Sequence, residues 1–336
     1  MSHFYLYILS GCLLLTGCVF DIALPGDGGE PALAPVPDEE KVAISFNSSI
    51  ELETKAESGN PTLADDVQVV VYAYEQMEVT TPGEAAVVSR PYKVSDGNGN
   101  LTVTGSAGIM YLAAGNYTFY ALSVNKDAAP PALNGSSFSE TVQLSNQTDY
   151  LYCASHTAIT SKPGETQNVA LAFHRLATSL KITIVSEGDN DEKITAATAP
   201  KITFAATNPG GSKITLGANP PVSVGVPVTD INAYTTVESA GNPTSGFTAE
   251  YILLPMQAAQ TIPVTITFPS ITFNGLVQTD KIYTLDITTP DGGFASGNQY
   301  TYKVNITGND IAFKRVSVNP WTGKTGSFPD EDVTED

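Results

Sequence analysis

The sequence predicts an all-β protein that folds as two tandem β-sandwich domains. It is 42% hydrophobic and only 15% charged, with many Thr, Ser, Val, Ile and aromatic residues, a composition typical of β-rich proteins. Short apolar stretches recur along the chain, and Gly, Pro and Asn separate them as tight turns separate strands. No window longer than a few turns keeps a helical period. The 336 residues suffice for two domains with sizeable cores.

The chain starts with a short apolar run that ends at Leu15-Thr16-Gly17-Cys18. A run of this length cannot span a bilayer as a helix, which needs about 20 residues, but it fits the apolar region of a secretory signal peptide. The residues before Cys18 resemble a bacterial lipobox, which implies cleavage before this cysteine and lipid on its thiol. We therefore expect a lipoprotein signal peptide at 1–17. The leader has no Lys or Arg before its apolar run, and the alternative is a buried N-terminal segment.

Structure is expected to begin after an acidic, Pro- and Gly-rich stretch at 18–41, which we interpret as a flexible tether. The first strand should cover 42–52, because its apolar residues alternate at a period of two with Ser48 in the one gap. The residues of this apolar face are Val42, Ile44, Phe46, Ile50 and Leu52. A polar loop that ends at Pro61 follows the strand.

The remaining strands divide between a first domain at 42–166 and a second at 167–328, followed by an acidic tail at 329–336. Residues 67–74 are apolar on both faces and should form a central strand. The last strand should cover 311–321, with a bulge where Lys314 and Arg315 interrupt the alternation. Other candidate strands lie at 117–122, 150–154, 169–176, 180–185, 201–204, 251–254, 264–268, 282–287 and 300–306.

Charge and reactive residues exclude several classes of function. The net charge of −19 argues against nucleic-acid binding, because no basic stripe exists to neutralise phosphate. Cys153 would have no disulfide partner once the leader is removed and Cys18 carries lipid. His156 follows Cys153 by three residues, but no second Cys/His pair accompanies them, so no metal site is expected. We find no nucleophile elbow, phosphate loop or dinucleotide fingerprint, and we expect no cofactor and no enzymatic activity.

Taken in order, these segments resemble the fimbrillins, the pilins of Bacteroidia type V pili. The lipobox and acidic tether lead into the first strand, which runs into Thr54-Lys55-Ala56, where that family places a basic residue before its processing point. Residues 67–74 are similar to the family's first mature strand, and 170–182 to the strand that opens its second domain. Residues 297–308, followed by a last strand to Trp321, are similar to its ending.

The resemblance implies two transthyretin-like sandwiches in a lipoprotein exported to the surface of the outer membrane. It also implies that a trypsin-like maturation protease cuts between Lys55 and Ala56, after which segment 42–55 leaves a groove. The C-terminal strand of another pilin subunit, either the same protein or a minor fimbrillin, would fill this groove in the fimbrium and support adhesion. The corresponding donor residues here are Ile311, Phe313, Val316, Val318 and Trp321.

The energetics of the first strand fit such an exchange. Burying five apolar side chains at roughly 1.5–3 kcal/mol each gives on the order of 10 kcal/mol, comparable to the net stability of a domain. Strand replacement of this kind is donor-strand complementation. Lys55 departs from the Arg of the best-known members, so either the protease accepts Lys or the subunit keeps its strand as an anchor or accessory subunit. A monomeric surface lipoprotein that binds glycan or host protein is a further alternative.

Overall fold

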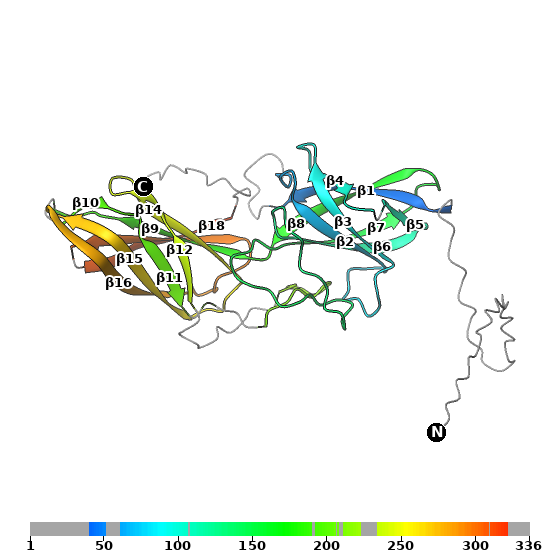
Figure 1. Ribbon diagram of the computed structural model, residues 1–336. Coiled ribbons are helices and arrows are strands. Elements are labelled where there is room, and N and C mark those ends of the chain that lie inside the picture. The colour runs from blue at the N-terminus through cyan, green and yellow to red at the C-terminus, as the bar shows by residue number, and fades with distance from the viewer. Residues whose placement is uncertain are drawn as a thin grey trace, which may run out of the picture. The chain divides into compact units, whose positions relative to one another are not determined.

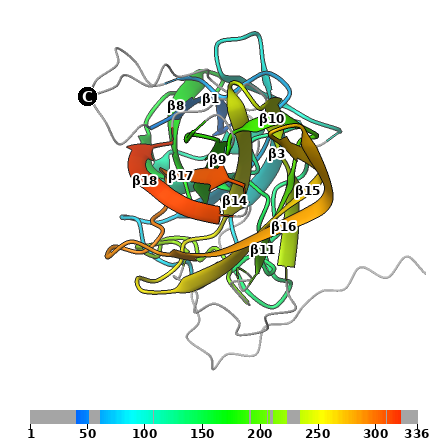
Figure 2. The ribbon, with the colours of Figure 1, turned by 90° about the vertical axis from the view of Figure 1, so that its left-hand side faces the viewer.

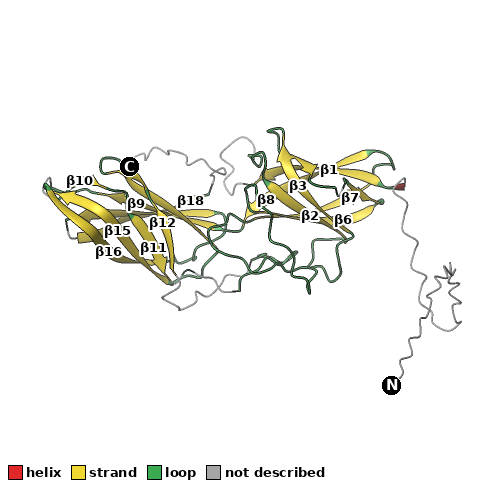
Figure 3. Cartoon of the chain, viewed as in Figure 1, coloured by secondary structure: helices red, strands yellow, loops and turns green. Residues whose placement is uncertain are grey.

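The computed structural model describes residues 40–51, 61–106, 108–189, 192–205, 207, 211–222, 234–308 and 310–321. Strands dominate this part of the chain, and Figure 3 shows them joined by loops and turns. The described residues include no helix with the length and apolar character that a membrane span requires. The expectation of an all-β protein is confirmed.

The first eight strands form a single sheet in the order β4-β3-β2-β6-β7-β8-β1-β5. β1 also pairs with β4, so the sheet closes on itself. Neighbouring strands are antiparallel except β1 and β8, which run parallel. We call this part the first half (Figure 1); its strands are β1 (Val42–Ile50), β2 (Gln68–Glu75), β3 (Val88–Ser95), β4 (Asn100–Val103), β5 (Met110–Leu112), β6 (Gly115–Ser123), β7 (Leu151–Ile159) and β8 (Thr166–Arg175).

The second half forms two five-stranded sheets, ordered β13-β14-β9-β17-β18 and β10-β15-β11-β12, with β16 paired to β15. Figure 2 shows the first of these as one layer and β15 with β16 in another. The strands are β9 (Thr178–Val185), β10 (Ile194–Ala197), β11 (Lys201–Ala205), β12 (Tyr234–Glu238), β13 (Ala240–Asn242), β14 (Gly246–Leu253), β15 (Thr261–Phe273), β16 (Leu276–Thr288), β17 (Asn298–Thr307) and β18 (Asp310–Pro320).

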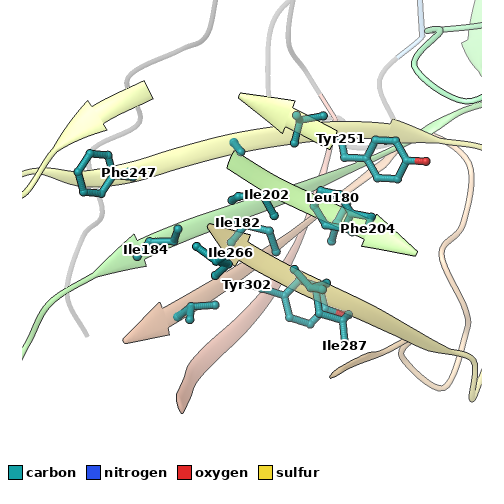
Figure 4. Close-up of a cluster of buried hydrophobic side chains, with 14 of the residues drawn as sticks. Leu180, Ile182, Ile184, Ile202, Phe204, Phe247, Tyr251, Ile266, Ile287 and Tyr302 are labelled. Carbon is teal, nitrogen blue, oxygen red and sulfur yellow. The ribbon is translucent and has the colours of Figure 1, made fainter. Parts of the chain in front are cut away.

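Each half has its own apolar core. Inward residues of the closed sheet, among them Phe46, Val71 and Phe119, form the core of the first half. The core of the second half lies between its two sheets and is therefore that of a sandwich. Figure 4 shows side chains of both sheets meeting there, among them Ile182, Ile202, Phe204, Tyr251, Ile266 and Tyr302.

A third cluster covers the outer face of the first sheet. The alternation that points Val69 and Val71 into the core points Tyr72 and Tyr74 outward, and loop residues bury these rings. Part of the cover comes from residues 211–222, which follow β11 of the second half. We call this stretch the cover segment. Its Ile214 carbonyl accepts a hydrogen bond from the Thr141 amide at 3.0 Å.

Several expectations for individual strands are confirmed and one is corrected. β2 lies between β3 and β6 and is buried on both faces, as the central strand predicted at 67–74 should be. The bulge expected near Lys314 is present, because Lys303 opposes Arg315 whereas Val304 opposes Phe313.

The expected domain boundary before residue 167 is wrong. β8 pairs with β1 over eight consecutive residue pairs and with β7 at two more, so it belongs to the first sheet. The second half starts with β9, which pairs with β14 and β17. Residues 170–182 therefore span two strands in different sheets. The closed first sheet also differs from the sandwich that we expected there, and a transthyretin-like topology stays a prediction.

Candidate functional site

β1 is the strand on which the sequence predictions converge, and it is buried along its whole inward face. Val42, Ile44, Phe46 and Ile50 are each at most 3% exposed, and Ser48 lies between them at 2%. The Phe46 ring packs edge-on against Tyr92 and Phe119, at centroid distances of 5.2 and 5.5 Å. Burial of the four apolar side chains contributes roughly 6–12 kcal/mol at about 1.5–3 kcal/mol each. The predicted alternation is confirmed from Val42 to Ile50.

Both edges of β1 are hydrogen bonded. One edge follows β8 from Ala43 to Ile50. The other meets β5 at residues 42–44 and β4 at Phe46 and Asn47. Removing β1 would therefore open the closed sheet between β8 on one side and β4 and β5 on the other. The result would be an apolar groove lined by unpaired backbone groups.

The chain leaves β1 after Ile50, and at Pro61 it is again beside the end of this strand. The Ile50 amide donates to the Pro61 carbonyl at 2.7 Å, and the Glu51 amide donates to the Phe173 carbonyl at 2.8 Å. Residues 52–60, which include Leu52, Lys55 and Ala56, lie outside the described residues. A cut within these residues would break the covalent link between β1 and Pro61, but none of the hydrogen bonds described above.

Gly99 closes the sheet against β1. Its carbonyl accepts both the Ser48 amide and the Ser48 hydroxyl, each at 2.8 Å. Gly99 has φ +77°, and a Cβ there would lie inside contact distance of the Ser48 carbonyl oxygen and 3.0 Å from Thr62. Only glycine lets the turn between β3 and β4 approach β1 this closely.

We expect Gly99→Ala to lower the free energy of unfolding by about 1–3 kcal/mol more than Gly97→Ala does. Both glycines have positive φ, but a Cβ at Gly97 would meet nothing within 4 Å. The comparison therefore separates backbone strain from the contact with β1. Urea unfolding of both variants measures the difference, and equal losses would show that the close approach at Ser48 does not stabilise the closure.

β18 ends at a second candidate site. It pairs with β17 along its length and lies at the edge of its sheet, and Ile311 packs against the second core. Val318 is 49% exposed, whereas Trp321, just after the strand, is 8% exposed. The Trp321 amide donates to the Gly297 carbonyl at 2.7 Å. Of Phe313 and Val316 the structure describes only the backbone.

Arg175, at the end of β8, holds Trp321. Its Nη1 donates to the Trp321 carbonyl at 2.7 Å, and its guanidinium carbon lies 4.6 Å from the indole centroid. Its Nε lies 3.1 Å from Asp149 Oδ2, which also accepts from Asn125 at 2.7 Å. Burial raises the pKa of Asp149, and Arg175 counteracts this rise.

The two sites thus meet on β8 at Phe173 and Arg175, two positions apart, a proximity that the sequence analysis missed. Phe173 accepts from the chain leaving β1, and Arg175 binds the residue after β18. The His174 side chain is 57% exposed, with its Nε2 3.3 Å from Glu51 Oε2. The sequence signal that could have indicated this meeting point is Arg175, a charged residue within the apolar stretch predicted as a strand at 169–176.

Among the residues that the structure describes, the remaining reactive side chains do not gather into a further site. Cys153 is free and buried in the first core, and burial raises its pKa to about 12. Within the described ranges, no group of three or more His, Cys, Asp or Glu could hold a metal ion. Cys18 lies outside the described residues, so its lipidation stays a prediction.

Comparison with known proteins identifies the fold and the family. The chain is similar to the crystal structure of a protein of Bacteroides uniformis whose name assigns it to cell adhesion. That match has 18% identity and a TM-score of 0.56, and covers 85% of this chain and 100% of the other. A protein of Bacteroides ovatus with the same assignment matches at 15% identity and a TM-score of 0.53, covering 84% and 98%. A search of the curated protein sequences found no match. The model of the fimbrillin-like family matches residues 54–321, which is most of the sequence. The chain therefore belongs to the fimbrillin-like family.

Proposed function

We propose that this protein is a structural subunit of a fimbria of the type V kind, assembled by exchange of β1 for a strand of a neighbouring subunit. The observation that carries the proposal is how β1 is packed and connected. It is buried on its inward face and hydrogen bonded on both edges, and yet its covalent link to the rest of the sheet runs through residues 52–60, which include Lys55. The family model begins at residue 54 and leaves β1 out, which supports a mature subunit without this strand.

The exchange needs the covalent cut for a physical reason. While β1 is attached, its effective concentration at the groove exceeds that of a strand from another molecule. Cleavage after Lys55 would remove this advantage, and β18 of a neighbouring subunit is the proposed donor. β18 suits the role because it lies at a sheet edge and near the C-terminus, so that it could leave without disrupting another strand pair in its sheet.

Family membership supports a location on the cell surface and in an extracellular appendage. We propose that the subunit reaches the outer membrane as a lipoprotein anchored at Cys18 before a trypsin-like protease processes it. Its partners would then be other pilin subunits and that protease. We assign it no catalytic role. A glycan platform built on tryptophan is disfavoured, because the single Trp is 8% exposed.

Mild trypsin treatment of the purified precursor should produce one early cut, after Lys55, followed by ladders that resist SDS. Lys55 lies between Ile50 and Pro61, which are hydrogen bonded to each other. A cut after Lys55 is therefore expected to leave the sheet folded. N-terminal sequencing of the product and gel electrophoresis without boiling measure the two outcomes.

A Lys55→Gln precursor provides the control and should stay monomeric under the same treatment. A wild-type product that is cut after Lys55 and stays a monomer would favour the monomeric binding protein instead. Retention of β1 on native fimbriae would favour an anchor or accessory subunit.

A further inference from the structure

The inward face of β1 has one polar position. Ser48 is 2% exposed, between Phe46 and Ile50, which are 1% and 3% exposed. Its hydroxyl donates to the Gly99 carbonyl at 2.8 Å in a buried hydrogen bond. The other inward residues need only an apolar neighbour of suitable size, whereas this position also supplies a hydrogen bond.

The space at Ser48 is limited by backbone. The Gly99 carbonyl accepts hydrogen bonds from both the amide and the hydroxyl of Ser48, and a Cβ added at Gly99 would lie inside contact distance of the Ser48 carbonyl oxygen. Backbone yields less readily than the far end of a side chain, so a larger residue here would have to push the turn at Gly99 away from the strand. Any strand in the groove would supply the amide, but only Ser or Thr would supply the hydroxyl as well.

We propose that the Ser48 position is a selective subsite of the acceptor groove, which takes a small hydroxyl-bearing residue of the incoming strand. This inference rests on the proposed function, because it requires that β1 can be replaced. It specifies the partner as a strand with three apolar residues at alternate positions, then Ser or Thr, then a further apolar residue. The subsite fixes the register, since a shift by two residues would place a bulky side chain against Gly99.

The chain's own segment 311–321 fits this pattern poorly. Ser317 is its only hydroxyl residue. With Ser317 at the Ser48 position, spacing by two places Arg315 at the Phe46 position if the strand runs in the direction of β1, or Asn319 if it runs in reverse. Either residue would enter the aromatic contact that Phe46 makes with Tyr92 and Phe119. The inferred partner is therefore the C-terminal strand of a different fimbrillin, and a second copy of this chain is a weaker donor that fills the groove only where that partner is absent.

Competition for the groove tests the inference. The protein is cut after Lys55 and incubated with a fluorescent peptide of residues 40–55, which unlabelled peptides then displace. The Ser48→Thr peptide should compete within about 3-fold of the unaltered one, because it keeps the hydroxyl. Ser48→Ala should be about 3- to 10-fold weaker, which is the range for one neutral hydrogen bond. Ser48→Leu should be about 100-fold weaker, because it adds overpacking to that loss.

The control is Ser49→Leu, the same change on the opposite face of the strand, where Ser49 opposes Ala172 of β8. It should compete within about 3-fold of the unaltered peptide. A peptide of residues 310–321 should compete at least about 30-fold less well. Equal competition by the Ser48 peptides, or tight binding of 310–321, would overturn the inference alone. Failure of the unaltered peptide to bind would contradict strand exchange itself, and the inference with it.

Discussion

Phe46→Ala should lower the free energy of unfolding of the first half by about 3–5 kcal/mol, the usual cost of deleting a fully buried phenyl ring. Phe46 is 1% exposed and lies between Tyr92 and Phe119, whose rings are held by β3 and β6. These strands are fixed by their own pairings, so the space left by Phe46 can collapse only partly. The variant loses a large share of the free energy that retains β1.

The consequence for assembly is specific. Once the chain is cut after Lys55, β1 of the Phe46→Ala protein should dissociate faster than wild-type β1, because the contacts that hold it are fewer. Near-ultraviolet circular dichroism in urea reports on the buried tyrosines and measures the stability. Gel filtration after the cut, with detection of the released fragment, measures the dissociation.

Ser49→Ala is the matched control, since Ser49 lies on the same strand with its side chain on the outer face. We expect it to change stability by less than about 0.5 kcal/mol. If Phe46→Ala cost no more than this control, β1 would not be held by its apolar face, and the strand-exchange proposal would lose its energetic basis.

The sequence was sufficient to predict β1 because one face of that strand is buried and the other is not. Such a strand shows a period of two, and Val42 through Ile50 show it with one interruption. The long strands β15 to β18 were found for similar reasons. The short strands β3, β4 and β5 were missed, since three to eight residues that contain Pro91, Asn100 or Tyr111 produce no clear period.

The alternation of apolar residues does not show which strands pair with each other. Val169 to Phe173 and Leu180 to Ile184 alternate alike, and nothing local says that the first stretch pairs with β1 and the second with β14 and β17. The closure at Gly99 joins residues that lie 51 positions apart in the sequence. Part of the cluster that buries Tyr72 and Tyr74 comes from the cover segment, which lies more than a hundred residues further along the chain. Alternation shows that a face is covered, but does not identify what covers it.

Arg175→Met should lower the free energy of unfolding by about 3–5 kcal/mol at neutral pH, because it leaves the Asp149 carboxylate buried without its cation. The change also removes the hydrogen bond to the Trp321 carbonyl and the stacking on the indole. Trp321 is the only tryptophan, so its fluorescence should shift to the red as the end of β18 loosens. Adding Asp149→Leu to Arg175→Met should recover part of the stability, since it removes the uncompensated charge, but it should not restore the emission.

The pH dependence separates the two contributions. Burial raises the pKa of Asp149 above its ordinary 3.8, and Arg175 opposes the rise, so the folded-state pKa climbs further in Arg175→Met. A carboxyl whose pKa is higher in the folded state takes up its proton more readily there. Its stabilising effect is thus present below the unfolded pKa and is lost as pH rises through the folded pKa. The deficit of Arg175→Met relative to wild type should therefore be largest at neutral pH and shrink as the pH falls toward 3.8. A deficit that stays constant over this range would place the cost in the lost contact with Trp321 instead, and Asp149 would then have no part in holding β18.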